Sequence, residues 1–273
     1  WLGLSYETLS DAIPFLTPQV RAGLSLAIAG IPALPIEAVT PESPIPCPAQ
    51  DVVCLGINYM AHSDEAEKYS ADAFATQHQD AIYFSKRVTR AVPDGGFIEA
   101  HTDLVKKLDY ECELAVVLGK DAKDVPAGQT KDYVFGYTIL NDVTGNAMRA
   151  EDRVHYYALY ASAADPEVLE RREQHLSYAA RYKGTDGFGP CGPWLVTADA
   201  VPDPGKLDVV CRVGGEIIAE DSTAYYTFSV PEVLAFISRF QTLEPGDIVS
   251  MGTAFRPSQG SRRSLHLADM QRV

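Results

Sequence analysis

Two glutamates, Glu111 and Glu113, stand two residues apart near the start of an apolar run that extends from Tyr110 to Leu118. Alternate side chains of a β-strand point to the same face, so the spacing predicts that the two carboxylates project together. Such carboxylates repel one another unless a cation joins them. A half-exposed strand with one solvated face is the alternative, but the rest of the run is apolar on both faces. We therefore interpret it as a buried strand whose acidic end needs a cationic partner.

A second apolar run, residues 134–140, is followed closely by Asp142. Together with Glu111 and Glu113, Asp142 would give three hard oxygen ligands at two strand ends. Mg²⁺, Mn²⁺ and Ca²⁺ prefer ligands of this kind. The sequence therefore predicts a divalent-metal site at these three residues, with a turn role for Asp142 as the alternative.

A histidine and a glutamate stand three residues apart at His62 and Glu65. On a helix this spacing makes the two side chains neighbours. A carboxylate that orients an imidazole is a common general-base arrangement, and water is the nucleophile that it would activate. The pair also lies in an acidic run with Asp64 and Glu67, so a solvated surface is the alternative interpretation.

The elements that must position these residues are short. Six prolines between residues 32 and 48 exclude a continuous helix there and indicate an extended connector. We predict a small N-terminal segment over residues 1–48, with a helix-like run from Thr17 to Ala29, and a main domain over residues 49–273. One helix, Val230 to Phe240, and many short apolar runs predict a mainly β, α+β fold for that domain. The runs expected to form strands are 52–56, 82–84, 110–118, 134–140, 194–197, 207–213, 216–218 and 248–251.

Residues 150–182 are predicted to form a helical insert in this domain. Asp165 suits an N-cap and Pro166 suits the first helical position, so we expect a helix from there to Tyr182. Such a helix could cap an active site, extend a subunit interface or pack on its own domain. The apolar residues expected on one side of it are Val168, Leu169, Leu176 and Ala180.

The composition limits the class of partner. Acidic residues outnumber basic residues 37 to 23, which gives a formal net charge of -14. This charge repels nucleic acid and anionic membranes, and an anionic small molecule would need a local positive charge such as a bound dication. Five cysteines without a CxxC pair indicate free thiols in a reducing compartment. Because we find neither a signal peptide nor a membrane span, we expect a soluble, cytoplasmic protein.

Five segments of the chain carry motifs that follow one another in a fixed order. They are Gly56-Ile57-Asn58-Tyr59 followed by His62 and Glu65, YECELAVVLGK at 110–120, Phe135-Gly136-Tyr137 with Asn141-Asp142-Val143-Thr144, KGTDGFGP at 183–190, and LEPGDI at 243–248 with Gly252-Thr253. These motifs resemble those of the fumarylacetoacetate hydrolase superfamily, over about residues 51–253. The resemblance implies a β-roll that encloses a metal site, usually in a homodimer, and a small 2-oxo or diketo acid as the substrate.

The resemblance also implies roles for single residues. The expected metal ligands are Glu111, Glu113 and Asp142, the expected catalytic residues are His62, Glu65 and Lys183, and the expected substrate contacts are Thr253, Arg149 and Tyr59. The chain departs from the family pattern after Asp142, where the family usually has Ala-Arg-Asp and then Gln. This chain has Gly145, Asn146, Ala147 and Arg149 instead, so Arg149 is the nearby residue that could supply the missing charge. An exposed structural arginine is the alternative.

The resemblance favours a Mg²⁺-dependent hydrolase, with Mn²⁺ or Ca²⁺ as alternative ions, that cleaves a C–C bond in an acylpyruvate-like diketo acid. His62, oriented by Glu65, would activate the water, and Lys183 would add positive charge beside the substrate enolate. An oxaloacetate-type decarboxylase or a 2-oxo acid tautomerase would use the same metal ligands. A family member that has lost activity and binds a metabolite is the third possibility.

Overall fold

A six-stranded sheet forms the centre of the protein, in the strand order β2-β1-β11-β4-β5-β8. The computed structural model describes residues 6–60, 80–254 and 264–266 of the chain. β1 runs parallel to β11, and the other neighbouring pairs in this sheet are antiparallel. The strands of the sheet are β1 (Val52–Leu55), β2 (Tyr83–Lys86), β4 (Cys112–Leu118), β5 (Val134–Asn141), β8 (Val196–Thr197) and β11 (Ile248–Thr253).

Both faces of the sheet are buried, which explains why its central strands are apolar at successive positions. On one face, Val116 and Val249 belong to a cluster that includes the apolar side of helix α7 (Val230–Phe240). On the other face, Val117 belongs to a cluster that includes Ile13 from the N-terminal part of the chain. The predicted helix at residues 230–240 is therefore confirmed, and its role is to cover one face of the sheet.

The helix predicted over residues 17–29 is α2 (Pro18–Ile28). It begins where the Thr17 hydroxyl accepts a hydrogen bond from the Val20 N–H, and Pro18 takes the first helical position. Both features are local, which is why the sequence predicts this boundary well.

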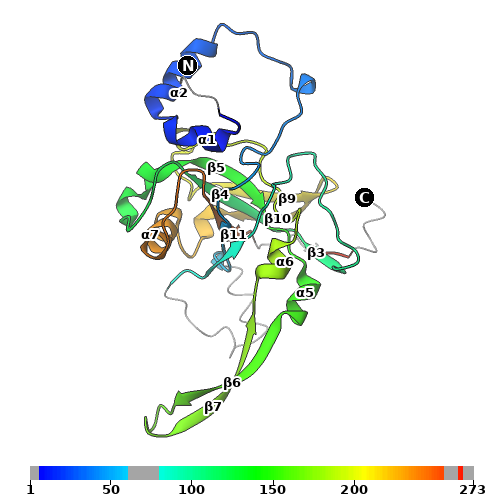
Figure 1. The fold of residues 1–273 in the computed structure, drawn as a ribbon, viewed down its shortest axis with the longest axis vertical. Coiled ribbons are helices and arrows are strands. Elements are labelled where there is room, and N and C mark those ends of the chain that lie inside the picture. Colours follow the sequence, from blue (N-terminus) through cyan, green and yellow to red (C-terminus); the bar gives the residue numbers. More distant parts are fainter. Residues whose placement is uncertain (1–5, 61–79, 255–263, 267–273) are drawn as a thin grey trace.

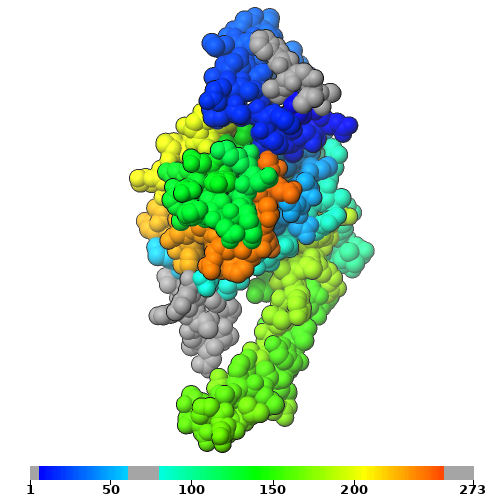
Figure 2. Space-filling view, turned by 60° about the vertical axis from the view of Figure 1, so that its left-hand side comes forward, coloured from blue at the N-terminus to red at the C-terminus, as the bar shows by residue number. Residues whose placement is uncertain are grey.

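The rest of the N-terminal segment consists of short helical turns and an extended connector. α1 (Leu9–Ala12) and η1 (Ile13–Phe15) precede α2, and η2 (Ile36–Ala38) lies in the proline-rich stretch. Figures 1 and 2 show this segment in blue at one end of the molecule, where α1 lies next to the sheet. Its division from the main domain at residue 48 stays a prediction.

Residues 153–177 form a long β-hairpin, and the prediction of a helix in this insert is wrong. β6 (Arg153–Ala161) pairs antiparallel with β7 (Leu169–Ser177), and the hairpin projects from the body of the molecule (Figures 1 and 2). We call residues 153–177 the arm.

The predicted helix start is the turn of the arm. The Asp165 carboxylate accepts a hydrogen bond from the Glu167 N–H, and the Asp165 carbonyl oxygen accepts one from the Val168 N–H. Asp followed by Pro serves a turn as well as it serves a helix start, and the β-branched and aromatic residues before it favour a strand. The expected apolar stripe does not form, because Leu169 and Leu176 lie on opposite faces of β7.

Smaller elements complete the fold. Met148 and Tyr182 pack in one cluster with Val143, directly after Asp142, and so support the end of β5.

The predicted mainly β, α+β class is confirmed. Among the described helices, none combines the length and the apolar character that crossing a membrane requires. The remaining elements are β3 (Lys107–Asp109) paired with β12 (Ser264–His266), β9 (Asp208–Val213) paired with β10 (Glu216–Ser222), α5 (Asn146–Glu151), α6 (Ala180–Gly184), η3 (Ala127–Tyr133), η4 (Ala198–Ala200) and η5 (Thr223–Tyr225).

Candidate active site

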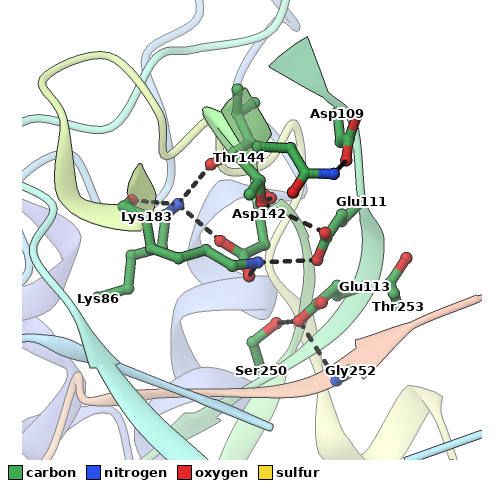
Figure 3. Close-up of polar contacts among 12 residues, drawn as sticks. Lys86, Asp109, Glu111, Glu113, Asp142, Thr144, Lys183, Ser250, Gly252 and Thr253 are labelled. Carbon is green, nitrogen blue, oxygen red and sulfur yellow. Dashed lines mark hydrogen bonds and ion pairs between the residues drawn. The ribbon is translucent and has the colours of Figure 1, made fainter. Parts of the chain in front are cut away.

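The three predicted carboxylates meet at neighbouring ends of β4 and β5. Glu113 belongs to β4, Glu111 directly precedes that strand, and Asp142 directly follows β5. The Asp142 N–H donates a hydrogen bond to the Glu111 carbonyl oxygen, 2.9 Å away, which fixes the two strand ends against each other. Oxygen atoms from all three carboxylates lie within 4.8 Å of one another. We call these three residues the carboxylate cluster (Figure 3).

Glu113, like Asp142, is a buried member of the carboxylate cluster. Its Oε2 accepts hydrogen bonds from the Ser250 hydroxyl at 2.5 Å and from the Gly252 N–H at 3.2 Å. Figure 3 shows this carboxylate facing β11, from which both donors come. Its Oε1 is buried and has no hydrogen-bond partner among the described residues. Burial raises the pKa of Glu113 well above its usual range, and the nearby charges of Asp142 and Glu111 raise it further.

The Gly252 N–H can point at Glu113 because the backbone of Gly252 lies in the left-handed region of positive φ, which favours glycine. Its φ is +89°, and the register of β11 against β4 shifts between Ser250 and Thr253. A Cβ atom at this position would lie 3.1 Å from the Cβ of Asn58. The bulge therefore depends on glycine, and it aims a backbone N–H at the carboxylate cluster.

Lys183, which the resemblance implies is catalytic, is buried beside the carboxylate cluster and is not a surface lysine. Its Nζ lies 2.9 Å from Oε2 of Glu111 and 2.5 Å from Oδ2 of Asp142. Burial alone would lower the pKa of Lys183, but the carboxylates of Glu111 and Asp142 more than offset this effect and raise it. The ammonium group therefore stays charged and bridges two members of the carboxylate cluster.

Lys86, at the end of β2, is a buried site residue that the sequence reasoning missed. Its Nζ lies 2.6 Å from Oδ1 of Asp142, and it also donates to the carbonyl oxygens of Val143 at 3.0 Å and Lys183 at 2.6 Å. Burial would raise the pKa of Asp142, but the ammonium groups of Lys86 and Lys183 lower it below its usual value. The sequence gives only a weak indication that Lys86 is buried, because a lysine that ends an apolar run usually lies at the surface.

The expected substrate contacts lie in three different environments. Thr253 is buried and pairs with Glu113 across β11 and β4, so it borders the carboxylate cluster. Tyr59 is fully buried and packs edge-on against Tyr226, with ring centroids 4.7 Å apart. Arg149 is exposed on α5, and its charge acts on Tyr182, the residue before Lys183. The expected dyad of His62 and Glu65 lies outside the described residues.

The carboxylate cluster fits a divalent metal ion by its chemistry. It offers carboxylate oxygens only, which are the ligands that Mg²⁺, Mn²⁺ and Ca²⁺ prefer. The Oε1 atom of Glu113 is a buried acceptor with no partner among the described residues, and a metal ion would satisfy it. A dication would also replace the proton that burial favours on Glu113. The residues that would hold the ion are Glu111, Glu113 and Asp142.

Known proteins resemble this chain in sequence and in fold. Oxaloacetate tautomerase YisK of Bacillus subtilis (strain 168) is 32% identical over 212 residues, which cover 78% of this chain and 61% of that protein. The solved fumarylacetoacetate hydrolase from psychrophilic Exiguobacterium antarcticum is 30% identical, with a TM-score of 0.58 over 87% of this chain and 76% of that one. The maleylpyruvate hydrolase from Sphingobium sp. SYK-6, solved with manganese (II) ion and pyruvate, is 25% identical, with a TM-score of 0.63 over 92% and 76% of the two chains.

The chain spans about three-fifths of the length of the curated relative YisK. Residues 51–273 match the family model described as fumarylacetoacetate (FAA) hydrolase C-terminal. This match covers the sheet and the carboxylate cluster together with Lys86 and Lys183. The chain that positions these groups is therefore a member of the fumarylacetoacetate hydrolase family.

Proposed function

We propose that this protein is a divalent-metal-dependent enzyme that cleaves a C–C bond in an acylpyruvate-like 2-oxo acid by hydrolysis. One observation carries the proposal: three carboxylates converge within 4.8 Å beside the charged ammonium group of Lys183. Mg²⁺ is the proposed ion, with Mn²⁺ or Ca²⁺ as alternatives. When bound, the ion would stabilise the negative charge that develops on the oxo group of the substrate.

The protein's own groups would complete the reaction. Lys183, held by Glu111 and Asp142, places a second positive charge beside the reacting oxygens, and such preorganised charge is most effective where water is excluded. The Thr253 hydroxyl, opposite Glu113, would hold the substrate carboxylate. Arg149 would meet a substrate group that extends toward α5.

Hydrolysis also needs an activated water molecule. We assign this step to His62, which would take a proton from water, and to Glu65, which would orient the imidazole. The proposal for these two residues rests on the sequence motif. The solved relatives named as hydrolases support the reaction class.

Tautomerisation of an oxaloacetate-like acid is the second candidate, because one specific observation favours it. Moving a proton between carbon and oxygen needs a metal-stabilised enolate and an acid or base, and the described cluster with Lys183 contains groups for both. YisK, a relative at 32% identity, is named an oxaloacetate tautomerase. Metal-dependent decarboxylation of the same acids would also use these groups.

Product analysis with acylpyruvates and oxaloacetate, with Mg²⁺ and with EDTA, tests the proposal. We expect Mg²⁺-dependent cleavage of an acylpyruvate by the wild-type protein. We expect His62→Ala to lose about 10²–10⁴ in hydrolysis rate, since that is the usual contribution of a general base. Lys183→Gln should lose about 10²–10³ in kcat, and Lys206→Gln, at an exposed lysine, serves as its control.

The other outcomes separate the alternatives. Turnover of oxaloacetate between its enol and keto forms that survives His62→Ala, without cleavage of any acylpyruvate, would identify a tautomerase, and release of CO₂ would identify a decarboxylase. Metabolite binding without turnover of any substrate would identify a binding protein. The homodimer stays a proposal from the family resemblance, and size-exclusion chromatography with light scattering measures it. The cytoplasmic location stays a proposal from the five cysteines without a CxxC pair.

A further inference from the structure

A second group of metal-ligating side chains lies on the arm, apart from the carboxylate cluster. It consists of His155 on β6 and of Glu173 and His175 on β7. His155 pairs directly with His175 across the two strands, and Glu173 is two residues from His175 on the same face. The hairpin register therefore places all three side chains together on one face of the arm.

The donor atoms of these three side chains lie close together. The Nε2 atom of His155 contacts Oε1 of Glu173, and the Nε2 atom of His175 lies 3.8 Å from the same oxygen. The two imidazole rings stack with their centroids 4.5 Å apart and their planes 7° from parallel. One ligand atom from each of the three residues lies within 4.8 Å of the others. Because χ2 of histidine is a soft torsion, the rings can tilt toward a shared ion without moving the backbone.

We propose that His155, Glu173 and His175 bind a divalent transition-metal ion of the Zn²⁺ class. Two imidazole nitrogens with one carboxylate oxygen form a donor set that Zn²⁺ uses in proteins, with a fourth position open to water. Imidazole favours Zn²⁺ over Mg²⁺, whereas the carboxylate cluster offers oxygen only. The chain would thus hold two metal sites of different chemistry. This inference does not depend on the proposed function.

The arm gives such an ion a structural role. An isolated two-stranded hairpin is marginally stable in water, and β6 and β7 pair only with each other among the described strands. An ion held by His155 from one strand and by Glu173 and His175 from the other would cross-link the two strands. Binding to the paired strands alone would stabilise the arm by mass action. The net charge of -14 favours the approach of a cation.

Titration of the purified full chain with Zn²⁺, in excess Mg²⁺ to occupy the carboxylate cluster, tests the site. We expect the wild-type protein to bind one more Zn²⁺ ion than the double variant His155→Ala/His175→Ala. Loss of a residue that only supports a ligand already costs about 10–100-fold in metal affinity, so each single variant should weaken Zn²⁺ binding by at least ~10-fold. Hydrogen exchange at the amides of β6 and β7 should slow on addition of Zn²⁺ in the wild-type protein alone.

Two further variants test whether a loss of Zn²⁺ binding is due to the loss of a metal ligand. Gln174→Ala alters the opposite face of β7 and should leave Zn²⁺ binding unchanged. His175→Cys, which keeps a ligand for Zn²⁺, should restore the binding that His175→Ala removes, and a merely structural role for His175 would not give this rescue. If the wild-type protein takes up no Zn²⁺, or if the double variant binds it with the same stoichiometry and affinity, the inference is wrong.

Discussion

The ammonium group of Lys86 lies 2.6 Å from Oδ1 of Asp142, and both side chains are buried. Lys183 binds the other carboxylate oxygen of Asp142, so the two lysines hold the carboxylate in one orientation from both ends. Lys86 also ties together the backbone on which Val143 and Lys183 lie. It therefore positions a proposed metal ligand and the helix that carries the proposed active-site lysine.

Replacement of Lys86 by methionine should destabilise the fold strongly. The variant removes the ammonium group and leaves buried acceptors on Asp142, Val143 and Lys183 without their donor. Breaking a buried ion pair typically costs about 3–5 kcal/mol, and we expect a loss of this size in the free energy of unfolding. Urea denaturation measures it. Lys206→Met, which breaks the exposed ion pair with Asp203, is the matched control and should change little. Equal losses in the two variants would show that Lys86 has no special structural role.

Metal binding should stabilise the protein through Glu113. An ion that binds only the native state adds about 2.7 kcal/mol when its concentration is 100 times the dissociation constant. We expect a higher melting temperature in Mg²⁺ or Mn²⁺ than in EDTA for the wild-type protein, and a much smaller difference for Glu113→Gln. Glu220→Gln, at an exposed residue of β10, should behave like the wild-type protein. Identical curves with and without metal, together with no metal by elemental analysis, would refute the assignment of the carboxylate cluster.

Asp247 should make stability depend on pH. Burial raises the pKa of Asp247 from 3.8 to about 6, so the folded state binds more protons than the unfolded state between these values. Stability from this residue is thus present at low pH and is lost as the pH rises through about 6. Asp247→Asn keeps an acceptor for the Glu244 N–H and cannot ionise. Relative to wild type, the variant should gain stability as the pH rises from 4 to 7 in urea denaturation. A constant difference between the two proteins would contradict this prediction.

Two glycine variants should have opposite effects. Gly252→Ala forces a side chain into a left-handed backbone and against Asn58, which should cost at least about 1–2 kcal/mol. Gly23 lies inside α2, and apart from its chain neighbours and the backbone of its own helix, no described residue has an atom within 4 Å of the place that an alanine Cβ would take. Gly23→Ala should therefore stabilise the protein by about 0.5–1 kcal/mol. Thermal and urea denaturation measure both. A neutral Gly252→Ala variant would show that the bulge in β11 tolerates a side chain.

The sequence predicts the carboxylate cluster because the relevant pattern is local. Glu111 and Glu113 share a face by the two-residue period of a strand, and Asp142 lies at the end of the adjacent strand. Lys86 and Asp142 are separated by 56 residues, and only the packed sheet shows that they meet. The same holds for Ser250 and Gly252, whose hydrogen bonds to Glu113 depend on a bulge that the sequence does not specify on its own.

The helix prediction fails in the arm for a different reason. Asp165 and Pro166 suit both a helix start and a turn, and the choice between them depends on the residues that precede them. Val154 and Tyr156 belong to a run of β-branched and aromatic residues that favours pairing with a second strand. The preference of that run for a strand outweighs the helix-start signal at Asp165 and Pro166, because an N-cap fixes only one end of a helix.

The position of β11 in the sheet affects the order in which the site can assemble. β11 lies between β1 and β4, and its Ser250 contacts Glu113 across 137 residues of sequence. At usual rates of synthesis that interval is on the order of ten seconds, during which the centre of the sheet lacks a strand. β4 and β5 are close in sequence and can pair early, as can the arm, whereas contacts of large sequence separation form late. A nascent chain therefore carries the acidic end of β4 without its β11 donors until residue 252 has left the ribosome.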